Sequence, residues 1–484
     1  MSPFTVVLIP FLGAPIIAFA GGHERLRVLA SWVTAIAFFI GVCTQLGPVL
    51  DGAGRSQVLW EIVPGLDLAF RVEPLGLIFA LVASFLWLTA TLYATSYMKA
   101  LSYGHLGRFF ASYALALGAT AGAAFSANLL TLFVFYEILT ISTYPLVTHA
   151  GGEDARRGGR TYLGYLLATS IGLFLVAILW TWQAAGTLDF VKGGILEGRV
   201  DRQWLPLLAG LYAFGIGKAA LMPVHRWLPA AMVAPAPVSA LLHAVAVVKV
   251  GVFTVLKVAV FIFGTDLLLE TGAAVWLTWV AAFTIVAASL VALRLDDLKA
   301  RLAYSTISQL SYVVLGALVA TPLAIIGAAL QIVMHAFAKI TLFFGAGAIQ
   351  VAHGRKKVSQ LDGLGRAMPL TFGAMAVATL SIVGLPIFGG MWSKWYLVAG
   401  ALDAHQWILV GALLASSLLN ILYLLVIPFR AFFRLPADDQ MPRQLAEAPL
   451  PMVVAMMITA GMCIVLFFAA EPLYELAGTL VFSE

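Results

Sequence analysis

Long apolar runs that are almost free of charged residues recur along the whole sequence. Most of these runs are about 20 residues long, the length that an α-helix needs to cross the hydrocarbon core of a bilayer and about twice what a membrane β-strand needs. Only 11% of the residues are charged and 62% are hydrophobic, whereas a soluble domain carries about 25% charged residues. The chain lacks the charge to cover a water-facing surface, so we predict an all-α polytopic membrane protein.

We predict about fourteen membrane-spanning helices in a single integral-membrane domain over residues 1–484. Their expected limits are 4–20, 27–47, 74–98, 109–125, 128–149, 161–183, 204–223, 237–263, 273–293, 302–320, 322–350, 368–398, 407–429 and 450–470. Segment 184–202 is polar enough to lie outside the membrane or along its surface. The first run starts directly after MSPF without a basic leader, so we expect a retained span rather than a signal peptide.

The charges of the loops predict an orientation. Most loop lysines and arginines follow odd-numbered spans, as Arg156, Arg157, Lys356 and Lys357 do. Because cytoplasmic loops carry an excess of Lys and Arg, these loops are expected in the cytoplasm and both termini on the outside, in a plasma (inner) membrane. The net charge of +5 gives no reason to expect a nucleic-acid partner, because the basic residues lie in short loops between spans.

Two apolar runs are interrupted by glycine and proline around a lysine. They are FGIGKAALMP (214–223), with Lys218, and GLPIFGGMWSKWYL (384–397), with Lys394. A phosphate-binding loop is excluded at Lys218 because the next residue is alanine rather than Ser or Thr. Paired broken helices in corresponding halves indicate inverted repeats and an ion site near the membrane midplane, and we expect broken helices at spans 7 and 12.

Few ionisable groups lie inside the predicted spans. A charge at the bilayer centre costs about 2.5–3.5 kcal/mol on insertion scales, so such groups usually have a function. The group comprises Glu137, Lys218, His243, Lys249, Lys257, His335, Lys339 and Lys394. Structural ion pairing is the alternative for Glu137, Lys218, Lys249 and Lys394. A purely structural hydrogen-bonded pair is the alternative for Lys339 and His335, four residues apart on one helical face.

Other polar groups have simpler interpretations. Lys257 is six residues from the end of its run, which favours a side chain that reaches the interface. His149, His225 and His353 are at span ends and are expected at the interface. Cys43 and Cys463 are interpreted as buried small apolar residues, since they form neither a disulfide framework nor a metal site. No cofactor or metal site is expected.

A buried lysine suits proton transfer. Desolvation disfavours the charged form of lysine, and a nearby carboxylate favours it. A lysine held between these effects can accept and release a proton, whereas arginine stays charged. Hydroxyl and amide side chains, such as those of YSTISQLSY (304–312) and of Thr140 to Tyr144, can hold ordered waters between such groups; helix–helix hydrogen bonding is the alternative role.

Several segments resemble one known superfamily, the proton-conducting antiporter-like membrane subunits. It includes subunits of Mrp-type cation/proton antiporters, of respiratory complex I and of membrane-bound hydrogenases. The resemblance rests on FYEILT (135–140), HRWLPAAMVAPAPVSALLHAVAVVKVG (225–251), DDLKARLAYSTISQLSYVVLG (296–316), HAFAKITLFFGAGAI (335–349) and LSIVGLPIFGGMWSKWYL (380–397). It implies fourteen helices with two inverted five-helix repeats, spans 4–8 (109–263) and 9–13 (273–429), after three spans in 1–108 and before a last span in 450–484.

The resemblance also implies a role for each buried group. Glu137 resembles the glutamate that pairs with the lysine of the broken seventh span, here Lys218. Lys249, with His243 near it, resembles the connecting lysine of span 8. His335 and Lys339 resemble the central relay of span 11, and Lys394 resembles the terminal lysine of span 12. Two departures stand out: Ala230 replaces an aspartate found in many members, and Lys394 replaces the glutamate usual in the complex I M-type subunit.

The resemblance predicts a proton-translocating subunit of a multisubunit monovalent cation (Na⁺)/H⁺ antiporter, with motifs closest to the D-type subunit of Mrp complexes. It would work in a lipid bilayer with other membrane subunits as partners. A proton-pumping subunit of complex I or of a membrane-bound hydrogenase is the alternative, and only then would the chain be part of an enzyme. A proton channel that powers an inorganic-carbon uptake protein is a third hypothesis. Glu137 is the one acid placed near the middle of a span, so sodium is expected to move elsewhere in the complex.

Overall fold

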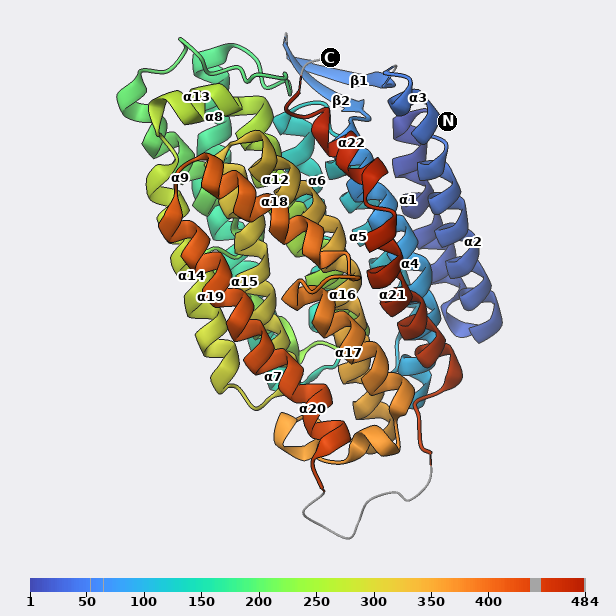
Figure 1. Ribbon diagram of the computed structural model, residues 1–484. Coiled ribbons are helices and arrows are strands. Elements are labelled where there is room, and N and C mark those ends of the chain that lie inside the picture. The colour runs from blue at the N-terminus through green and yellow to red at the C-terminus, as the bar shows by residue number, and fades with distance from the viewer. Residues whose placement is uncertain (53, 64, 436–444, 483–484) are drawn as a thin grey trace.

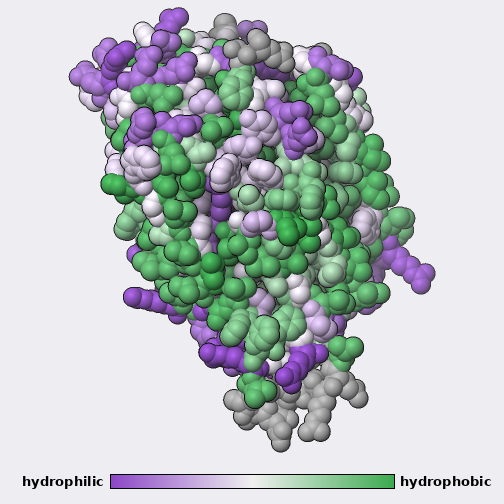
Figure 2. All heavy atoms as spheres, viewed as in Figure 1, coloured by the Kyte–Doolittle hydropathy of each residue, from purple (hydrophilic) through white to green (hydrophobic). Residues whose placement is uncertain are grey.

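The computed structural model of the protein describes residues 1–484 except 53, 64, 436–444 and 483–484. Eleven helices in this described part are long and apolar enough to cross a membrane, and Pro369–Val383 is a shorter apolar helix. They stand side by side in one bundle (Figure 1). Apolar side chains cover much of its flank, while polar and charged ones gather at both ends (Figure 2). The predicted polytopic helical architecture is confirmed, whereas the count of fourteen spans and the two inverted repeats stay predictions.

The N-terminal region contains two long helices, a hairpin and a third long helix. The elements are α1 (Pro3–Phe19), η1 (Ala20–Gly22), α2 (Glu24–Cys43), α3 (Leu46–Leu50), β1 (Ser56–Val63), β2 (Leu66–Arg71) and α4 (Pro74–Ala100). The antiparallel hairpin β1–β2 pairs Ser56 with Arg71 and was not expected from the sequence. It turns at Gly65, whose φ of +79° suits glycine.

The next region contains the first broken helix. Its elements are α5 (Leu106–Ala124), α6 (Leu129–Val147), α7 (Gly152–Thr169), η2 (Ser170–Phe174), α8 (Leu175–Ala185), η3 (Arg202–Trp204), α9 (Leu205–Gly215), η4 (Gly217–Ala219), α10 (Trp227–Ala230), η5 (Ala231–Val233), α11 (Ala236–Ala240), η6 (Leu241–Val245), α12 (Val247–Lys257) and η7 (Val258–Phe263). The segments η2, η6 and η7 are π-helical. Such wide turns frequently occur at functional sites, and η6 carries His243.

The C-terminal half contains the second broken helix. Its elements are α13 (Thr265–Thr271), α14 (Val275–Arg294), α15 (Leu298–Val319), α16 (Pro322–His353), η8 (Val358–Gln360), η9 (Leu364–Arg366), α17 (Pro369–Val383), α18 (Gly390–Asp403), α19 (Trp407–Asn420), η10 (Ile421–Leu425, π-helical), α20 (Val426–Phe433), α21 (Leu450–Phe468) and α22 (Glu471–Gly478).

Both expected breaks are present. The run predicted over 204–223 is helical only to Gly215 in α9 and resumes as the single turn η4. The run predicted over 368–398 stops at Val383, continues through Gly384 with a φ of +90°, and resumes at Gly390. Glycine and proline therefore interrupt these two helices where the sequence indicated.

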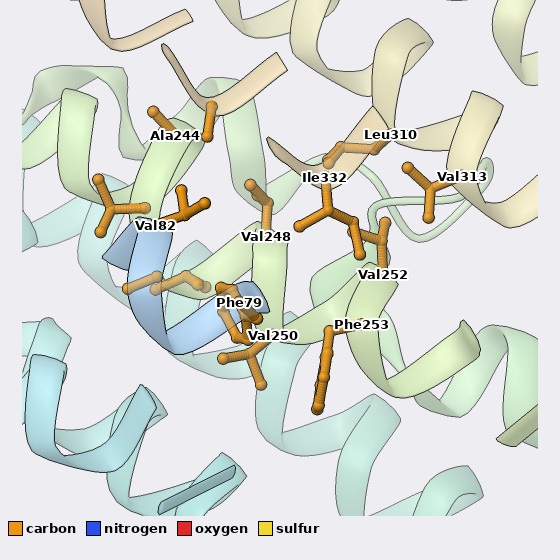
Figure 3. Packing of buried hydrophobic residues seen from close by; sticks show 14 of the residues in the cluster. Phe79, Val82, Ala244, Val248, Val250, Val252, Phe253, Leu310, Val313 and Ile332 are labelled. Carbon is orange, nitrogen blue, oxygen red and sulfur yellow. The ribbon is translucent and has the colours of Figure 1, made fainter. Parts of the chain in front are cut away.

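The centre of the bundle is packed with buried apolar side chains from several long helices. Figure 3 shows Phe79 of α4 together with Val248, Val252 and Phe253 of α12 and Ile332 of α16; these residues are 0–1% exposed. Helices α16 and α18 approach closely at Gly327, where a Cβ would lie 2.7 Å from the backbone nitrogen of Leu397. This tight apolar matrix surrounds the ionisable groups that the sequence singled out.

Candidate functional site

Lys218 lies at the break that follows α9, within the turn η4. Its side chain is 0% exposed. The ammonium donates hydrogen bonds to the carbonyl oxygen of Tyr136, at 2.9 Å, and to Oγ1 of Thr140, at 2.5 Å. It also lies 3.1 Å from the centroid of the Tyr136 ring. A buried charge without an ionic partner is costly, so these neutral acceptors favour the charged form less than a carboxylate would.

The neighbouring backbone holds this break in place. The indole nitrogen of Trp227 donates a hydrogen bond of 2.9 Å to the carbonyl oxygen of Gly217. On the other side, α12 presents Gly251, where an added Cβ would overlap the backbone of Lys218 and Ala219. Glycine at 251 is therefore required for α12 to contact the broken segment this closely.

Glu137 lies on α6, next to Tyr136 and one turn before Ile141. Both of its carboxylate oxygens are buried, and neither has a hydrogen-bond partner among the described residues. The carboxylate is within electrostatic range of Lys218, yet no ion pair joins the two in the described part of the chain. The lysine is thus bonded to the residues before and after the acid rather than to the acid itself.

Two further groups meet at the centre of the bundle. The ammonium nitrogen of Lys249, on α12, lies 2.8 Å from Nδ1 of His335, on α16. The exposed fractions are 1% for Lys249 and 2% for His335. At this distance the amine and the imidazole are joined by a hydrogen bond, which is the geometry that proton transfer between them needs.

His243 and Lys339 lie beside this pair. His243 is 0% exposed, and its ring packs against the ring of Phe343 with centroids 4.7 Å apart. Neither of its ring nitrogens has a partner among the described residues. Lys339, also 0% exposed, donates a 2.7 Å hydrogen bond to Oγ of Ser305 on α15. Lys339 is within electrostatic range of both His243 and His335, so the structure brings these predicted residues together.

Lys394 lies at the far end of this group, four residues after α18 begins. Its ammonium donates hydrogen bonds to the carbonyl oxygen of Val383, at 3.1 Å, and to Oγ of Ser417, at 2.8 Å. The first acceptor is the last residue of α17, so the lysine bridges the break in its own span. Like Lys218, Lys394 is bonded to neutral acceptors beside an interrupted helix.

A small polar cavity lies between the central histidine and Lys394. It has a volume of about 10 Å³ and is lined by Gln309, Gln331, Met334, His335, Ser381, Ile382, Gly390 and Lys394. That volume is about the room that one water molecule requires. Nε2 of His335 and Nε2 of Gln309 are buried without a partner among the described side chains, while Gln331 links Gln309 at 2.8 Å to Ser393 at 2.6 Å. One water here would connect His335 to Lys394.

The expectation that Lys257 reaches the membrane interface is wrong. Its side chain is 0% exposed, and its ammonium lies 3.1 Å from Oε2 of Glu73. It also donates a 2.9 Å hydrogen bond to the carbonyl oxygen of Ser126 and lies 3.9 Å from the Phe190 ring. Arg71 pairs with the same glutamate at 2.7 Å. Glu73 lies directly before α4, far from Lys257 in the sequence. The sequence pattern therefore gave no sign of this ion pair and favoured a Lys257 side chain at the membrane interface.

The histidines at span ends lie near helix termini. His149, 8% exposed, follows α6 and packs against Phe109. Burial, together with the positive charge of Arg108, lowers the pKa of His149 to about 4. His225 and His353 are half-buried. Among the described residues there is no group of three or more His, Cys, Asp or Glu side chains that could hold a metal ion, and Cys43 and Cys463 are free thiols.

Comparison with known proteins gives consistent matches. Residues 126–420 match the family described as NADH:quinone oxidoreductase/Mrp antiporter, transmembrane. The chain is 33% identical over 398 residues to the N subunit of NADH-quinone oxidoreductase from Desulforudis audaxviator, covering 81% of this chain and 77% of that protein. It is 27% identical over 475 residues to the D subunit of the Na⁺/H⁺ antiporter from Alkalihalophilus pseudofirmus, covering 97% and 94%. A chain in the structure of the Mrp complex from Dietzia sp. DQ12-45-1b shares the fold, with a TM-score of 0.86, 22% identity and coverage of 99% and 96%.

Proposed function

Because the chain belongs to the NADH:quinone oxidoreductase/Mrp antiporter transmembrane family, we propose that it is a proton-translocating subunit of a multisubunit Na⁺/H⁺ antiporter, of the D type found in Mrp complexes. The observation that supports this proposal best is the series of ionisable groups in the bundle interior. Lys218, His243, Lys249, His335 and Lys339 are 0–2% exposed, and the membrane interior retains such groups mainly for ion or proton pathways.

The first step in this proposal is a change of partner at Lys218. Its ammonium now bonds to Tyr136 and Thr140, which flank Glu137 on α6. If the ammonium moves from Thr140 to the Glu137 carboxylate, the ion pair favours the protonated lysine. If it moves back, desolvation opposes the charge and the proton leaves. An exchange between neighbouring positions on one helix thus loads and unloads the amine.

The second step passes the proton through the centre. The proton released by Lys218 is taken up by Lys249, whose Nζ lies 2.8 Å from Nδ1 of His335. From there it reaches Lys339 or, through the small polar cavity, Lys394. Each donor becomes neutral as the next acceptor gains the proton, so no net charge is created in the apolar interior. His243, with two ring nitrogens without partners among the described residues beside Lys339, can hold the proton between these steps.

The proposal assigns protons, and not sodium, to this chain. Hard cations favour several oxygen ligands, and Glu137 is the one carboxylate that the sequence places near the middle of a span. Sodium would cross elsewhere in the assembled complex, in which other membrane subunits are the partners. The chain would lie in the plasma membrane, with both termini on the outside.

A complex I-type or hydrogenase-type pump is the second candidate. The 33% identity to the N subunit of an NADH-quinone oxidoreductase favours it, and Lys394 in place of glutamate argues against the M-type member. The proteins that copurify with the chain distinguish these two candidates and the inorganic-carbon hypothesis. Redox subunits would identify a pump, and small hydrophobic subunits with a large A-type subunit would identify an antiporter.

The test of the relay is proton transport by the assembled complex in inverted membrane vesicles, followed with a pH-sensitive dye. We expect Lys218→Ala and Lys394→Ala to abolish most of the proton movement, while Lys192→Ala, at an exposed position outside the spans, keeps it. Full transport by both relay variants in a complex of normal composition would refute the proposal.

A further inference from the structure

A row of hydroxyl groups, buried except at its last member Ser417, runs from Lys339 along α15 towards Lys394. Its first member is Ser305, which accepts the hydrogen bond from Lys339 at 2.7 Å. The hydroxyl of Tyr423 lies 3.2 Å from Oγ of Ser305. Tyr423 belongs to the π-helical turn η10, which interrupts the span formed by α19 and α20. A wide turn that aims a tyrosine hydroxyl at the partner of a buried lysine is the kind of irregularity found at functional sites.

Three serines from three helices form the middle of this row. Ser289 of α14, Ser308 of α15 and Ser416 of α19 make a triangle of hydroxyl oxygens at 3.0, 3.1 and 3.2 Å. All three side chains are 0% exposed. Ser289 is within electrostatic range of the Tyr423 hydroxyl, and a rotation of that hydroxyl would connect the triangle to the first part of the row.

The last part of the row reaches Lys394. The hydroxyl of Tyr312, one turn after Ser308 on α15, donates a 3.0 Å hydrogen bond to the carbonyl oxygen of Leu413 on α19, and the hydroxyls of Ser416 and Ser417 are within its electrostatic range. Ser417 accepts the hydrogen bond from Lys394 at 2.8 Å. Helices α14, α15 and α19 pack against one another along this row (Figure 1). The row thus runs between α14, α15 and α19, whereas the cavity between His335 and Lys394 is lined by residues of α15, α16, α17 and α18.

We propose that these hydroxyls form a second proton path from Lys339 to Lys394, running through Ser305, Tyr423, the triangle Ser289–Ser308–Ser416, Tyr312 and Ser417. This inference rests on the proposed proton-translocating function. Each hydroxyl has one proton to donate and lone pairs to accept another, so it can take a proton from one neighbour as it gives its own to the next. Lys339 loses one proton, Lys394 gains one, and every hydroxyl ends neutral.

Several hydroxyls of this path donate to acceptors outside it. Ser289 and Ser308 donate to the carbonyl oxygen of Ile285, Tyr312 to that of Leu413, and Tyr423 to Oδ1 of Asn420. Transfer along the row requires each of these hydroxyls to rotate from its present acceptor to its neighbour in the row. The rotation restores the starting arrangement after each transfer, because each hydroxyl must turn back before the next proton can pass.

The alternative role of these hydroxyls is to hold helices together, as small polar residues do in membranes. The chain offers a matched control for that role. Ser311 is also on α15 and 0% exposed, and its hydroxyl donates a hydrogen bond to the carbonyl oxygen of Ile307 on its own helix. Ser311→Ala therefore removes a buried serine hydroxyl without interrupting the row.

The experiment measures proton movement by the assembled complex in inverted vesicles, in H₂O and in D₂O, with complex content and thermal stability determined for each variant. Tyr423→Phe removes only the hydroxyl, and the double variant Ser289→Ala/Ser416→Ala opens the triangle. Because we infer that most protons reach Lys394 through this row rather than through the cavity beside His335, we expect each to slow transport about tenfold, which corresponds to about 1.4 kcal/mol in the barrier, and to change the ratio of the H₂O and D₂O rates. Ser311→Ala keeps both the rate and the ratio.

Two results would overturn this inference and leave the proposed function intact. One is a wild-type rate for both Tyr423→Phe and the double variant while Lys394→Ala is inactive. The other is an equal loss in Ser311→Ala and Tyr423→Phe, because the hydroxyls would then act through packing. Full transport by Lys394→Ala would instead refute the proposed function.

Discussion

The buried ion pair between Lys257 and Glu73 predicts an asymmetric loss of stability. Removing the carboxylate by Glu73→Gln leaves the ammonium of Lys257 in a site that is 0% exposed. At 3.1 Å and an effective dielectric constant of about 20, the lost Coulomb attraction is roughly 5 kcal/mol. The cation–π contact with Phe190 and the bond to Ser126 stay in place. The expected net loss is about 4 kcal/mol, within the range for removing one partner of a buried pair.

The reverse substitution should have a smaller effect. Lys257→Met removes the buried charge and fills its place with an apolar chain of similar length, while Glu73 keeps its pair with Arg71 at 2.7 Å. Replacing a buried ionic group with an apolar residue is often close to neutral when no unpaired charge stays behind. We therefore expect a loss of about 1 kcal/mol or less. In the double variant, Lys257→Met should recover most of the stability lost in Glu73→Gln.

Thermal unfolding of the purified protein in detergent measures these differences. With about 2.1 cal/mol/K of unfolding entropy per residue, the 484 residues give about 1 kcal/mol/K in total, so 4 kcal/mol lowers Tm by about 4 °C. Cys463, which is 2% exposed, reports unfolding through its reaction with a thiol dye. Equal Tm values for Glu73→Gln and Lys257→Met would refute the reasoning, because the asymmetry follows directly from the unpaired ammonium.

Three further predictions concern transport and pH. Glu137→Gln removes the charge that can hold the proton on Lys218, so we expect at least tenfold slower proton movement in vesicles. Glu137→Asp keeps the charge and should retain part of the rate. Equal rates in the two variants would contradict the exchange of Lys218 between Thr140 and Glu137. Gly251→Val inserts a side chain against the backbone of Lys218 and should slow proton transport. Gly411 has open space around it, so Gly411→Val should leave transport unchanged. Equal slowing in both variants would show that a larger side chain slows transport wherever it is introduced, and not through Lys218. The pKa of His149 is about 4 in the folded protein and about 6.5 in the unfolded chain. Between these two pH values the unfolded state therefore binds a proton at His149 that the folded state does not. The contribution of the neutral His149 side chain to folding stability is complete above about pH 6.5 and is lost as the pH falls towards about 4. The Tm of the wild type should therefore fall over this pH range, and the Tm of His149→Gln should fall less. Identical Tm profiles against pH in the two proteins would disprove this role of His149.

Hydropathy was sufficient to predict the class of fold, because burial of apolar helices in lipid depends on local composition. The breaks at Lys218 and before Lys394 were also predictable, since Gly217 and Gly384 are visible in the sequence. The buried positions of Lys218, Lys249 and Lys339 could be predicted because lysine is rare in such runs. These features depend on neighbours within a few residues.

Features that depend on distant contacts were missed. Lys257 was placed at the interface because Glu73 lies in another part of the chain, before α4. The hairpin β1–β2 was missed because its strands lie in a stretch interpreted as a loop between spans. Ser289 and Ser416 lie in apolar spans far apart in the sequence, and only the packing of α14 and α19 against α15 shows that they meet Ser308.

The central claim is that buried amines in this chain carry protons across the bundle. Lys249 tests it most directly, because its amine is 1% exposed and lies 2.8 Å from His335 while Lys249→Met keeps the length of the side chain. The measurement is the initial rate of proton movement by the assembled complex in inverted vesicles. The account predicts a rate below about one tenth of the wild-type rate, and a wild-type rate in a normally assembled Lys249→Met complex would contradict it.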